Sequence, residues 1–271
     1  MNAKAYAFQV GQFECFVLLE GASVIGAEGM LRRFPDAGTE ADYRQAYADM
    51  GLSLDEADNS MNILLAKVGD ERLLVDTGMG GLLLESLQLV GHTPEDITLV
   101  VLTHTHGDHV LGLLNSDGEP TFPNARYVIS AVELAFWQAR IDDGVPDQRA
   151  IVDMLLARGL QQIDMDAEIL PGLRALPIPG HTPGQIALRF EADGETLIHQ
   201  ADLLHSPMQF AHPEWSPRFD ADTGASVRMR RAALEQAADN KLLLLFYHLT
   251  FPGLGYVQRA GSGYRWGRVT D

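Results

Sequence analysis

The residues with the clearest chemistry are gathered in one short stretch, Val101-Leu-Thr-His-Thr-His-Gly-Asp-His109, where an apolar run leads into three histidines and an aspartate. Residues two apart in a strand face the same side, so His104 and His106 present their imidazoles together as the strand ends. A glycine then permits a sharp turn, after which Asp108 and His109 face a different direction. The stretch therefore predicts two half-sites of a metal centre.

The donor types indicate which metals such a centre would hold. Imidazole and carboxylate suit zinc or a similar first-row divalent ion, such as manganese, iron or cobalt. The stretch contains no thiolate, which would be typical of a closed structural zinc site, so a catalytic centre fits better. The alternative is a group of surface histidines at a strand end, but polar residues seldom follow an apolar strand at this density by accident.

Three further candidate ligands lie far along the chain, each at or near the end of a predicted strand: His181, Asp202 and His248. Ligands that arrive from successive strand ends converge on one edge of a sheet. That arrangement can hold two metals. Isolated histidines such as His92 and His212 are more often ordinary surface residues.

Strands and helices alternate along the part of the chain that must position these residues. Ile97–Leu102 is the strand that delivers the first histidines, and a helix continues from Asp108 through Val110–Leu114. Turn residues predict two hairpins, Asn62–Val68 with Arg72–Val75 and Gln185–Phe190 with Thr196–Gln200. Other strands are expected over Tyr6–Leu19, with Gly11 and Gly21 as turn points, and over Tyr127–Ile129, Leu173–Ile178 and Lys241–Tyr247; other helices over Thr39–Met50, Leu82–Val90, Ala131–Arg140, Gln148–Leu160 and Thr223–Ala238, with a loop at 142–146.

Length and composition favour one large domain. The chain has 271 residues, of which 46% are hydrophobic, enough for a substantial core. We expect a single domain over residues 1–271, with an insertion at about 31–60 that could overhang the site. The single cysteine, Cys15, lies in an apolar run and is better explained as a buried small hydrophobe than as a nucleophile.

Charge and hydropathy limit the partners. The formal net charge of −17 repels polyanions and weighs against nucleic acid or an anionic membrane surface, so a small-molecule substrate is expected. No apolar run is long enough to cross a bilayer, and Met1–Val10 lacks the pattern of a secretory signal. A cytoplasmic location is the resulting expectation. Assembly into a homodimer stays open.

The order and spacing of the candidate ligands resemble those of the metallo-β-lactamase superfamily. The motifs that carry the resemblance are His104-Thr-His-Gly-Asp-His109 and Pro179-Gly-His-Thr-Pro-Gly184, followed by Asp202 and His248. The resemblance extends over essentially the whole chain and implies an α/β fold, an αββα sandwich of two mixed β-sheets flanked by helices. It also implies one metal on His104, His106 and His181 and a second on Asp108, His109 and His248, with Asp202 bridging the two.

The resemblance also bears on the roles of two other positions, Asp76 and residue 201. Asp76, in Asp76-Thr-Gly, would orient a ligand histidine, although capping of the next turn is an equally good explanation. Residue 201 is Ala where the family commonly has Gly, which should alter backbone packing but not ligation. The His-x-His-x-Asp-His form also differs from the glutamate-containing motif of the flavodiiron branch, so a redox di-iron role is not expected.

The closing stretch, Tyr247–Tyr256 followed by Gly261–Trp266, resembles the methyl parathion hydrolase branch and its lactonase relatives, as does Phe122–Ala125 with Phe136-Trp137. This implies a dinuclear metal-dependent hydrolase of neutral ester-like small molecules. A lactone or carboxylic ester is the expected substrate, and a hydroxide between the metals the nucleophile. Phosphotriester hydrolysis is the first alternative, followed by a glyoxalase II-like thioesterase and a non-catalytic binding or sensor protein.

Asp108 and His205 are the candidate catalytic residues. Related lactonases have a tyrosine at the position of His205, and a neutral imidazole could also donate an N–H to a developing oxyanion. The alternative for His205 is a loop histidine bonded to backbone. An apolar substrate pocket is expected from the insertion near Leu31–Phe34 and from Phe136, Trp137, Met208, Phe210 and Phe251, although ordinary core is the more common role for a tryptophan such as Trp137.

Overall fold

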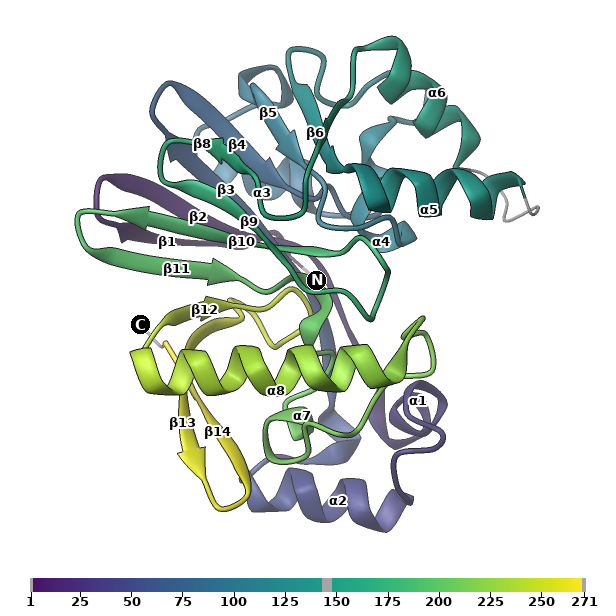
Figure 1. Cartoon of the computed structure of the whole chain (residues 1–271), viewed down its shortest axis with the longest axis vertical. Helices are drawn as coiled ribbons and strands as arrows, with labels where there is room; N and C mark the ends of the chain where they lie inside the picture. The colour runs from purple at the N-terminus through teal and green to yellow at the C-terminus, as the bar shows by residue number, and fades with distance from the viewer. Residues whose placement is uncertain (1, 143–147, 270–271) are drawn as a thin grey trace.

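The computed structural model describes residues 2–142 and 148–269, in which two seven-stranded sheets pack face to face between helices (Figure 1). The strand orders are β1-β2-β3-β4-β5-β6-β7 in the first sheet and β14-β13-β12-β11-β10-β9-β8 in the second. Both sheets are mixed, because each combines antiparallel hairpins with parallel pairs. The predicted αββα sandwich is therefore confirmed.

The first sheet begins with antiparallel strands and ends with parallel ones. Gly11 forms the predicted turn between the first two strands, with a φ of 52°. The turn predicted at Gly21 is wrong, because the strand continues through this residue with a shift in register between Leu19 and Gly21. The strands are β1 Ala5–Val10, β2 Phe13–Val24, β3 Asp58–Val68, β4 Glu71–Val75, β5 Leu99–Val101, β6 Arg126–Ser130 and β7 Gln161–Ile163.

The second sheet contains the other predicted hairpin at its centre. Its parallel pair, β11 with β12, brings the residues after both strands to the same edge. The sequence did not predict the closing hairpin, β13 with β14, or the three-residue strands β7 and β8. The strands are β8 Glu168–Leu170, β9 Leu173–Pro177, β10 Ile186–Ala192, β11 Glu195–His199, β12 Leu243–Leu245, β13 Leu254–Ala260 and β14 Gly263–Arg268.

The helices α2, α3, α5, α6 and α8 agree closely with the predicted ranges, whereas the sequence did not predict α1 and α7. The helix expected after Asp108 is short and passes into a 3-10 turn over Leu111–Leu113, and residues 143–146 of the predicted loop lie outside the described residues. Within the described ranges, no helix is long and apolar enough to span a bilayer. The helices are α1 Gly26–Arg33, α2 Glu40–Asp49, α3 Leu83–Leu89, α4 Gly107–Val110, α5 Ala131–Asp142, α6 Arg149–Ala157, α7 Met208–Ala211 and α8 Thr223–Asn240.

Three apolar layers hold the sandwich together. The layer between the sheets includes Leu64, Leu188 and Phe190, all completely buried. Outside the first sheet, α5 and α6 bury side chains such as Leu155 against it, and α8 covers the second sheet with Leu234, on the opposite side of the molecule (Figure 1). Burial of this kind is the main favourable contribution to folding.

The segment at about 31–60 lies beside the sandwich, and its last residues, from Asp58, already belong to β3. Thr39 caps α2 in a capping box with Asp42, as its sequence position predicts. Phe34, Tyr43 and Tyr47 form an apolar cluster with Met208 of α7. The segment is therefore anchored on the loop that follows β11, next to the edge where the candidate ligands lie.

The carboxyl ends of five strands meet at this edge. Asp76 follows β4, His104 follows β5, His181 follows β9, Asp202 follows β11 and His248 follows β12. A backbone hydrogen bond of 3.1 Å from Ile186 N to Thr103 O joins the two sheets there. The two sheets thus present their functional residues to one common site.

His199, at the end of β11, should make the protein acid-labile. Its side chain is buried, its Nδ1 accepts from Ala201 N at 3.3 Å, and burial lowers its pKa from 6.5 to about 4. Below pH 6.5 the unfolded chain binds a proton that the folded chain does not, so the free energy of unfolding falls as the pH drops toward 4. This histidine alone should remove roughly 2 kcal/mol between pH 7 and pH 5.

Urea unfolding of metal-free protein at the two pH values measures this contribution. His199→Asn keeps an acceptor for the Ala201 N–H but cannot titrate, so its loss between pH 7 and pH 5 should be smaller than that of the wild type by the same amount. An equal loss in both proteins would show that His199 contributes nothing to the acid lability.

Candidate metal centre

The first donor group consists of His104, His106, His181 and Asp202. His106 Nδ1 lies 3.2 Å from His104 Nε2 and 2.7 Å from His181 Nε2. Asp202 Oδ2 lies 3.6 Å from His104 Nε2 and 3.3 Å from His181 Nε2. Three imidazole nitrogens and a carboxylate oxygen therefore face a common point.

The second group consists of Asp108, His109 and His248. His248 Nε2 lies 3.3 Å from Asp108 Oδ2, and His109 Nε2 lies 4.0 Å from the same oxygen. Asp108 is the more open carboxylate of the cluster, with 30% of its side chain exposed against 3% for Asp202. The structure thus brings together both predicted half-sites.

Asp202 lies between the two groups. Its Oδ1 is 3.2 Å from His109 Nε2, and its Oδ2 is 3.2 Å from His248 Nε2. Because one carboxylate contacts histidines of both groups, its position is that of the predicted bridge. Its neighbour Ala201 has a φ of 44°, a left-handed conformation that costs a non-glycine residue about 1–2 kcal/mol. The glycine common at this position in the family is thereby explained, and Ala201 does not prevent Asp202 from reaching both groups.

The protonation states fit a bound cation. Burial and the neighbouring His181 lower the pKa of His106 to about 3, so its imidazole is neutral, the form that binds metal. Burial opposes the charge of His248, but Asp202 and Asp108 outweigh it and raise the pKa of His248 to about 9. Burial also opposes the charge of Asp202, yet the surrounding imidazoles hold its pKa well below the usual range. The site is therefore built around an ionised carboxylate.

Unpartnered atoms point to the same conclusion. His109 Nε2 and Asp202 Oδ1 are buried 3.2 Å apart, but they do not meet hydrogen-bond geometry, and neither atom has another hydrogen-bond partner among the described residues. Buried polar atoms left without partners are rare and costly in native proteins. Metal ions at the centre of the two groups would satisfy them, so the residues present fit a metal centre.

Hydrogen bonds outside the cluster fix which nitrogen His109 and His181 present. Asp76 Oδ2 lies 2.8 Å from His109 Nδ1, and Asp220 Oδ1 lies 2.9 Å from His181 Nδ1. With Nδ1 engaged, each ring directs Nε2 toward the cluster. Such partners orient ligand histidines and raise their basicity.

Asp76 is the orienting carboxylate, not merely a turn cap. Besides His109, it accepts from Thr103 N at 2.8 Å and from Thr103 Oγ1 at 2.7 Å. Its φ of 63° is unusual for a residue other than glycine, although Asp tolerates it better than most. Asp76 therefore ties the end of β5 to the second donor group.

Glu133, which the sequence analysis missed, holds the two loops of the first donor group. Its Oε1 accepts from Thr105 N at 2.9 Å and from Thr105 Oγ1 at 2.8 Å, between His104 and His106. Its Oε2 accepts from Thr182 Oγ1 and Gly184 N, in the loop of His181. Burial raises the pKa of Glu133, opposed by these hydrogen bonds. One carboxylate thus links ligand loops from both sheets.

Asp220 and Arg230, also missed, form a buried pair behind His181. Arg230 Nη2 lies 3.5 Å from Asp220 Oδ2, and Arg230 Nε donates to Leu203 O at 2.9 Å. The arginine therefore connects the carboxylate that orients His181 with the loop that carries Asp202.

A cavity of about 290 Å³ opens above the cluster. Arg33 and Phe219, neither of them singled out in the sequence, line it together with residues of the cluster. His205 also lines it, with Nε2 3.1 Å from Asp202 Oδ2, so its side chain belongs to the cluster and is not bonded to backbone. The residues that line the cavity are Arg33, His106, Gly107, Asp108, His181, Asp202, His205, Phe219 and His248.

The five residues predicted to contact substrate are not among those that line this cavity. Trp137, Met208 and Phe210 are buried in three separate apolar clusters, so ordinary core is the role of Trp137. Phe136 and Phe251 contact the cations Arg140 and Lys4. Near residues 31–34, the predicted apolar wall is wrong, because Phe34 is completely buried and the cationic Arg33 lines the cavity instead.

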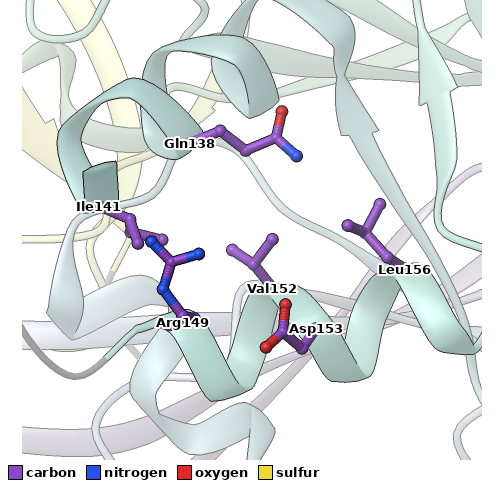
Figure 2. Close-up of a pocket in the computed structure, with 6 residues that line it drawn as sticks. All are labelled: Gln138, Ile141, Arg149, Val152, Asp153 and Leu156. Atoms are coloured by element: carbon purple, nitrogen blue, oxygen red, sulfur yellow. The ribbon is translucent and has the colours of Figure 1, made fainter.

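A second cavity, of about 330 Å³, lies between α5 and α6 (Figure 2). Gln138, Val152 and Leu156 are among the side chains around it. It contains no histidine among its described lining residues and one carboxylate, that of Asp153, so it lacks the donors of a metal site.

Cys15, the single cysteine, is buried, and burial raises its pKa to about 12, as expected of a structural residue.

Comparison with known proteins identifies the family. The model of the metallo-beta-lactamase superfamily matches residues 58–248, well over half of the chain. The chain belongs to the metallo-β-lactamase superfamily. Among solved structures, it is similar to AidC, described as a dizinc quorum-quenching lactonase in complex with a product, N-hexnoyl-L-homoserine. The two are 29% identical over 99% of this chain and 98% of AidC, with a TM-score of 0.91.

Other similarities are more distant or shorter. The hydrolase AbOPH of the beta lactamase superfamily is 24% identical over 100% of this chain and 99% of its own, with a TM-score of 0.87, and supports the fold alone. YobT of Bacillus subtilis (strain 168), an uncharacterized protein, is 30% identical over 53% of this chain and 63% of YobT. An N-acyl homoserine lactonase of Bacillus cereus is 28% identical over 41% of this chain and 40% of that protein. The chain thus spans less than two thirds of the length of these curated relatives.

Together with the similarity to the dizinc lactonase AidC, the two donor groups support two metal ions.

Glu133→Gln tests how far the site depends on the residue that links its loops. The amide nitrogen cannot accept from Gly184 N, so the first donor group should loosen and its metal affinity should fall by about 10–100-fold. Competition with a chromophoric chelator should show one ion released more easily and the other little changed. Glu235→Gln, on the exposed face of α8, is the matched control. Unchanged affinity for both ions would contradict the linking role.

Proposed function

We propose that this chain is a dinuclear metal-dependent hydrolase that opens lactone esters, with zinc as its metal. The observation that carries the proposal is the convergence of two donor groups on Asp202 at the floor of a cavity of about 290 Å³. The similarity to AidC, which covers nearly the whole of both chains, supports a lactone as the substrate. The His-rich, thiolate-free donor set supports zinc.

The assignment of ligands follows the two groups. His104, His106 and His181 would hold one ion and Asp108, His109 and His248 the other, with Asp202 shared between them. When bound, two divalent ions supply Lewis-acid activation of water and of the ester carbonyl. The chain's own residues must orient the ester and move protons.

We assign that work to Asp108 and His205. Asp108 is ionised, because His109 and His248 outweigh the effect of burial and hold its pKa below the usual range, and it is partly open to the cavity. Its exposure to the cavity supports a role in receiving a proton from water that enters the site. Burial lowers the pKa of His205 to about 3, so it faces the cavity as a neutral imidazole. Its one N–H faces Asp202 Oδ2 at 3.1 Å in the metal-free site, and it could be donated to a developing oxyanion or to the leaving alkoxide once metal occupies that oxygen.

A substrate panel on one zinc-replete preparation tests the proposal. We expect kcat/KM to be highest for N-acyl homoserine lactones, lower for aryl esters and lowest for phosphotriesters. Phosphotriesters as the best class would favour the alternative activity. No turnover of any class by protein holding two ions per chain would overturn the assignment as a hydrolase of these bonds.

His205→Phe tests the proposed hydrogen-bond donor. Removal of one donor to the oxyanion typically lowers kcat by about 10–1000-fold, whereas KM should change much less because the interaction strengthens as charge develops. Metal content should stay at that of the wild type. His92→Phe, remote from the cluster, is the control. Unchanged kcat with full metal content would leave His205 a structural role only.

A further inference from the structure

Arg33, the last residue of α1, extends its guanidinium from the inserted segment into the cavity above the cluster. Its Nη1 donates to Asn59 Oδ1 at 2.8 Å and to His205 O at 3.3 Å. Its backbone carbonyl accepts from Arg218 N at 2.8 Å. Arg33 is therefore held both at its guanidinium and at its backbone, as expected for a residue that presents donors in a defined direction.

The rest of the guanidinium is uncommitted. Among the described residues, Nε and Nη2 of Arg33 have no hydrogen-bond partner, and no carboxylate forms an ion pair with it. Its carbon lies 5.9 Å from the ring centroid of Phe219, which in turn contacts the ring of His205 at 4.9 Å. Arg33, Phe219 and His205 thus form one wall of the cavity, with free N–H donors on it.

Charge balance does not explain this arginine. Burial lowers the pKa of Arg33, and Asp202, Asp108 and Tyr47 oppose this without forming an ion pair with it. With two divalent ions in place, those two carboxylates are more than neutralised, so the cluster no longer attracts a guanidinium. A partly desolvated cation without its own counter-ion is costly unless oxygen acceptors satisfy it. The free donors therefore call for an acceptor on the bound molecule.

We propose that Arg33 determines substrate specificity by binding the carbonyl oxygen of an amide next to the scissile lactone ester. This inference rests on the proposed lactonase function and names the substrate class of the same site. A fixed, charged donor rejects analogues that lack the acceptor, because its N–H groups are then left unpaired in a partly dehydrated site. The enzyme should consequently prefer N-acyl amino lactones to plain alkyl lactones.

Two substrates separate recognition of the amide from general binding: N-hexanoyl homoserine lactone and an α-alkyl-γ-butyrolactone of the same chain length. Arg33→Met keeps much of the side-chain volume but removes all donors. It should lower kcat/KM about 10–100-fold for the amide substrate and less than about threefold for the alkyl lactone, as a hydrogen bond to a charged group predicts. Arg32→Met, next to it on the exposed face of α1, should change neither.

Calorimetry gives a readout independent of turnover. Zinc-loaded wild type and Arg33→Met are titrated with two hydrolysed acids, N-hexanoyl homoserine and the matching 2-alkyl-4-hydroxybutanoate, after metal content is shown to be equal. The variant should bind only the amide acid more weakly, by about tenfold or more. Equal weakening of both acids would mean that Arg33 binds the carboxylate, and no weakening would mean that it binds neither; either result overturns the proposal.

The two experiments distinguish failure of the proposed lactonase function from failure of the specificity role of Arg33. If neither lactone is hydrolysed, the proposed function fails, and the calorimetric comparison still decides whether Arg33 binds the amide. If both lactones are hydrolysed and their kcat/KM ratio is unchanged in Arg33→Met, the specificity role alone is overturned.

Discussion

The site depends on one buried negative charge. Asp202 has only 3% of its side chain exposed, and its Oδ2 lies within 3.6 Å of nitrogens from His104, His181, His205 and His248. Transfer of a lone carboxylate into such surroundings would be prohibitive, so the fold must supply cations, protons or metal around it. The histidines converge because this charge is there, and the outer carboxylates keep their rings turned toward it. Loss of any one of these partners leaves the charge less compensated.

That convergence is a property of the whole fold and not of one loop. Each outer carboxylate reaches a histidine or a ligand loop on a different element: Asp76 contacts the loop after β5, Asp220 the loop after β9, and Glu133 both of these loops. The strands bring the ligands to one edge, and these contacts then fix the orientation of the histidine rings and their loops. The end of the inserted segment adds another contact of this kind, since His248 Nδ1 lies 3.2 Å from Ser60 O. Through Arg33 it adds charge to the opposite wall of the cavity.

The histidine motifs could be located in the sequence because their information is local. The spacing of the histidines and a turn at glycine already indicate His104, His106, Asp108 and His109, although β5 ends before them at Val101, and the strands that precede the other candidate ligands are strongly apolar. Arg33 could not be found in this way, because nothing local distinguishes it from Arg32, which is exposed and paired with Glu28. Ser130-x-x-Glu133 is a visible capping pattern. The acceptor role of Glu133, however, depends on Thr105 and Thr182, which lie 28 and 49 positions away in the sequence. The prediction of the substrate-contacting residues failed for a related reason, since large apolar side chains are equally suited to a position in the core.

Both donor groups draw on both sheets. His104 and His106 come from the first sheet, but His181 and Asp202 of the same group come from the second, and His248 of the second sheet completes the group begun by Asp108 and His109. No half of the sandwich can therefore assemble a complete coordination set. During synthesis, the second group lacks its last member until His248 emerges, 46 residues after Asp202. Metal binding to the second group therefore requires nearly the whole chain, and it would add to the apolar contacts and to the hydrogen bonds, such as those of Glu133, that already join the two sheets.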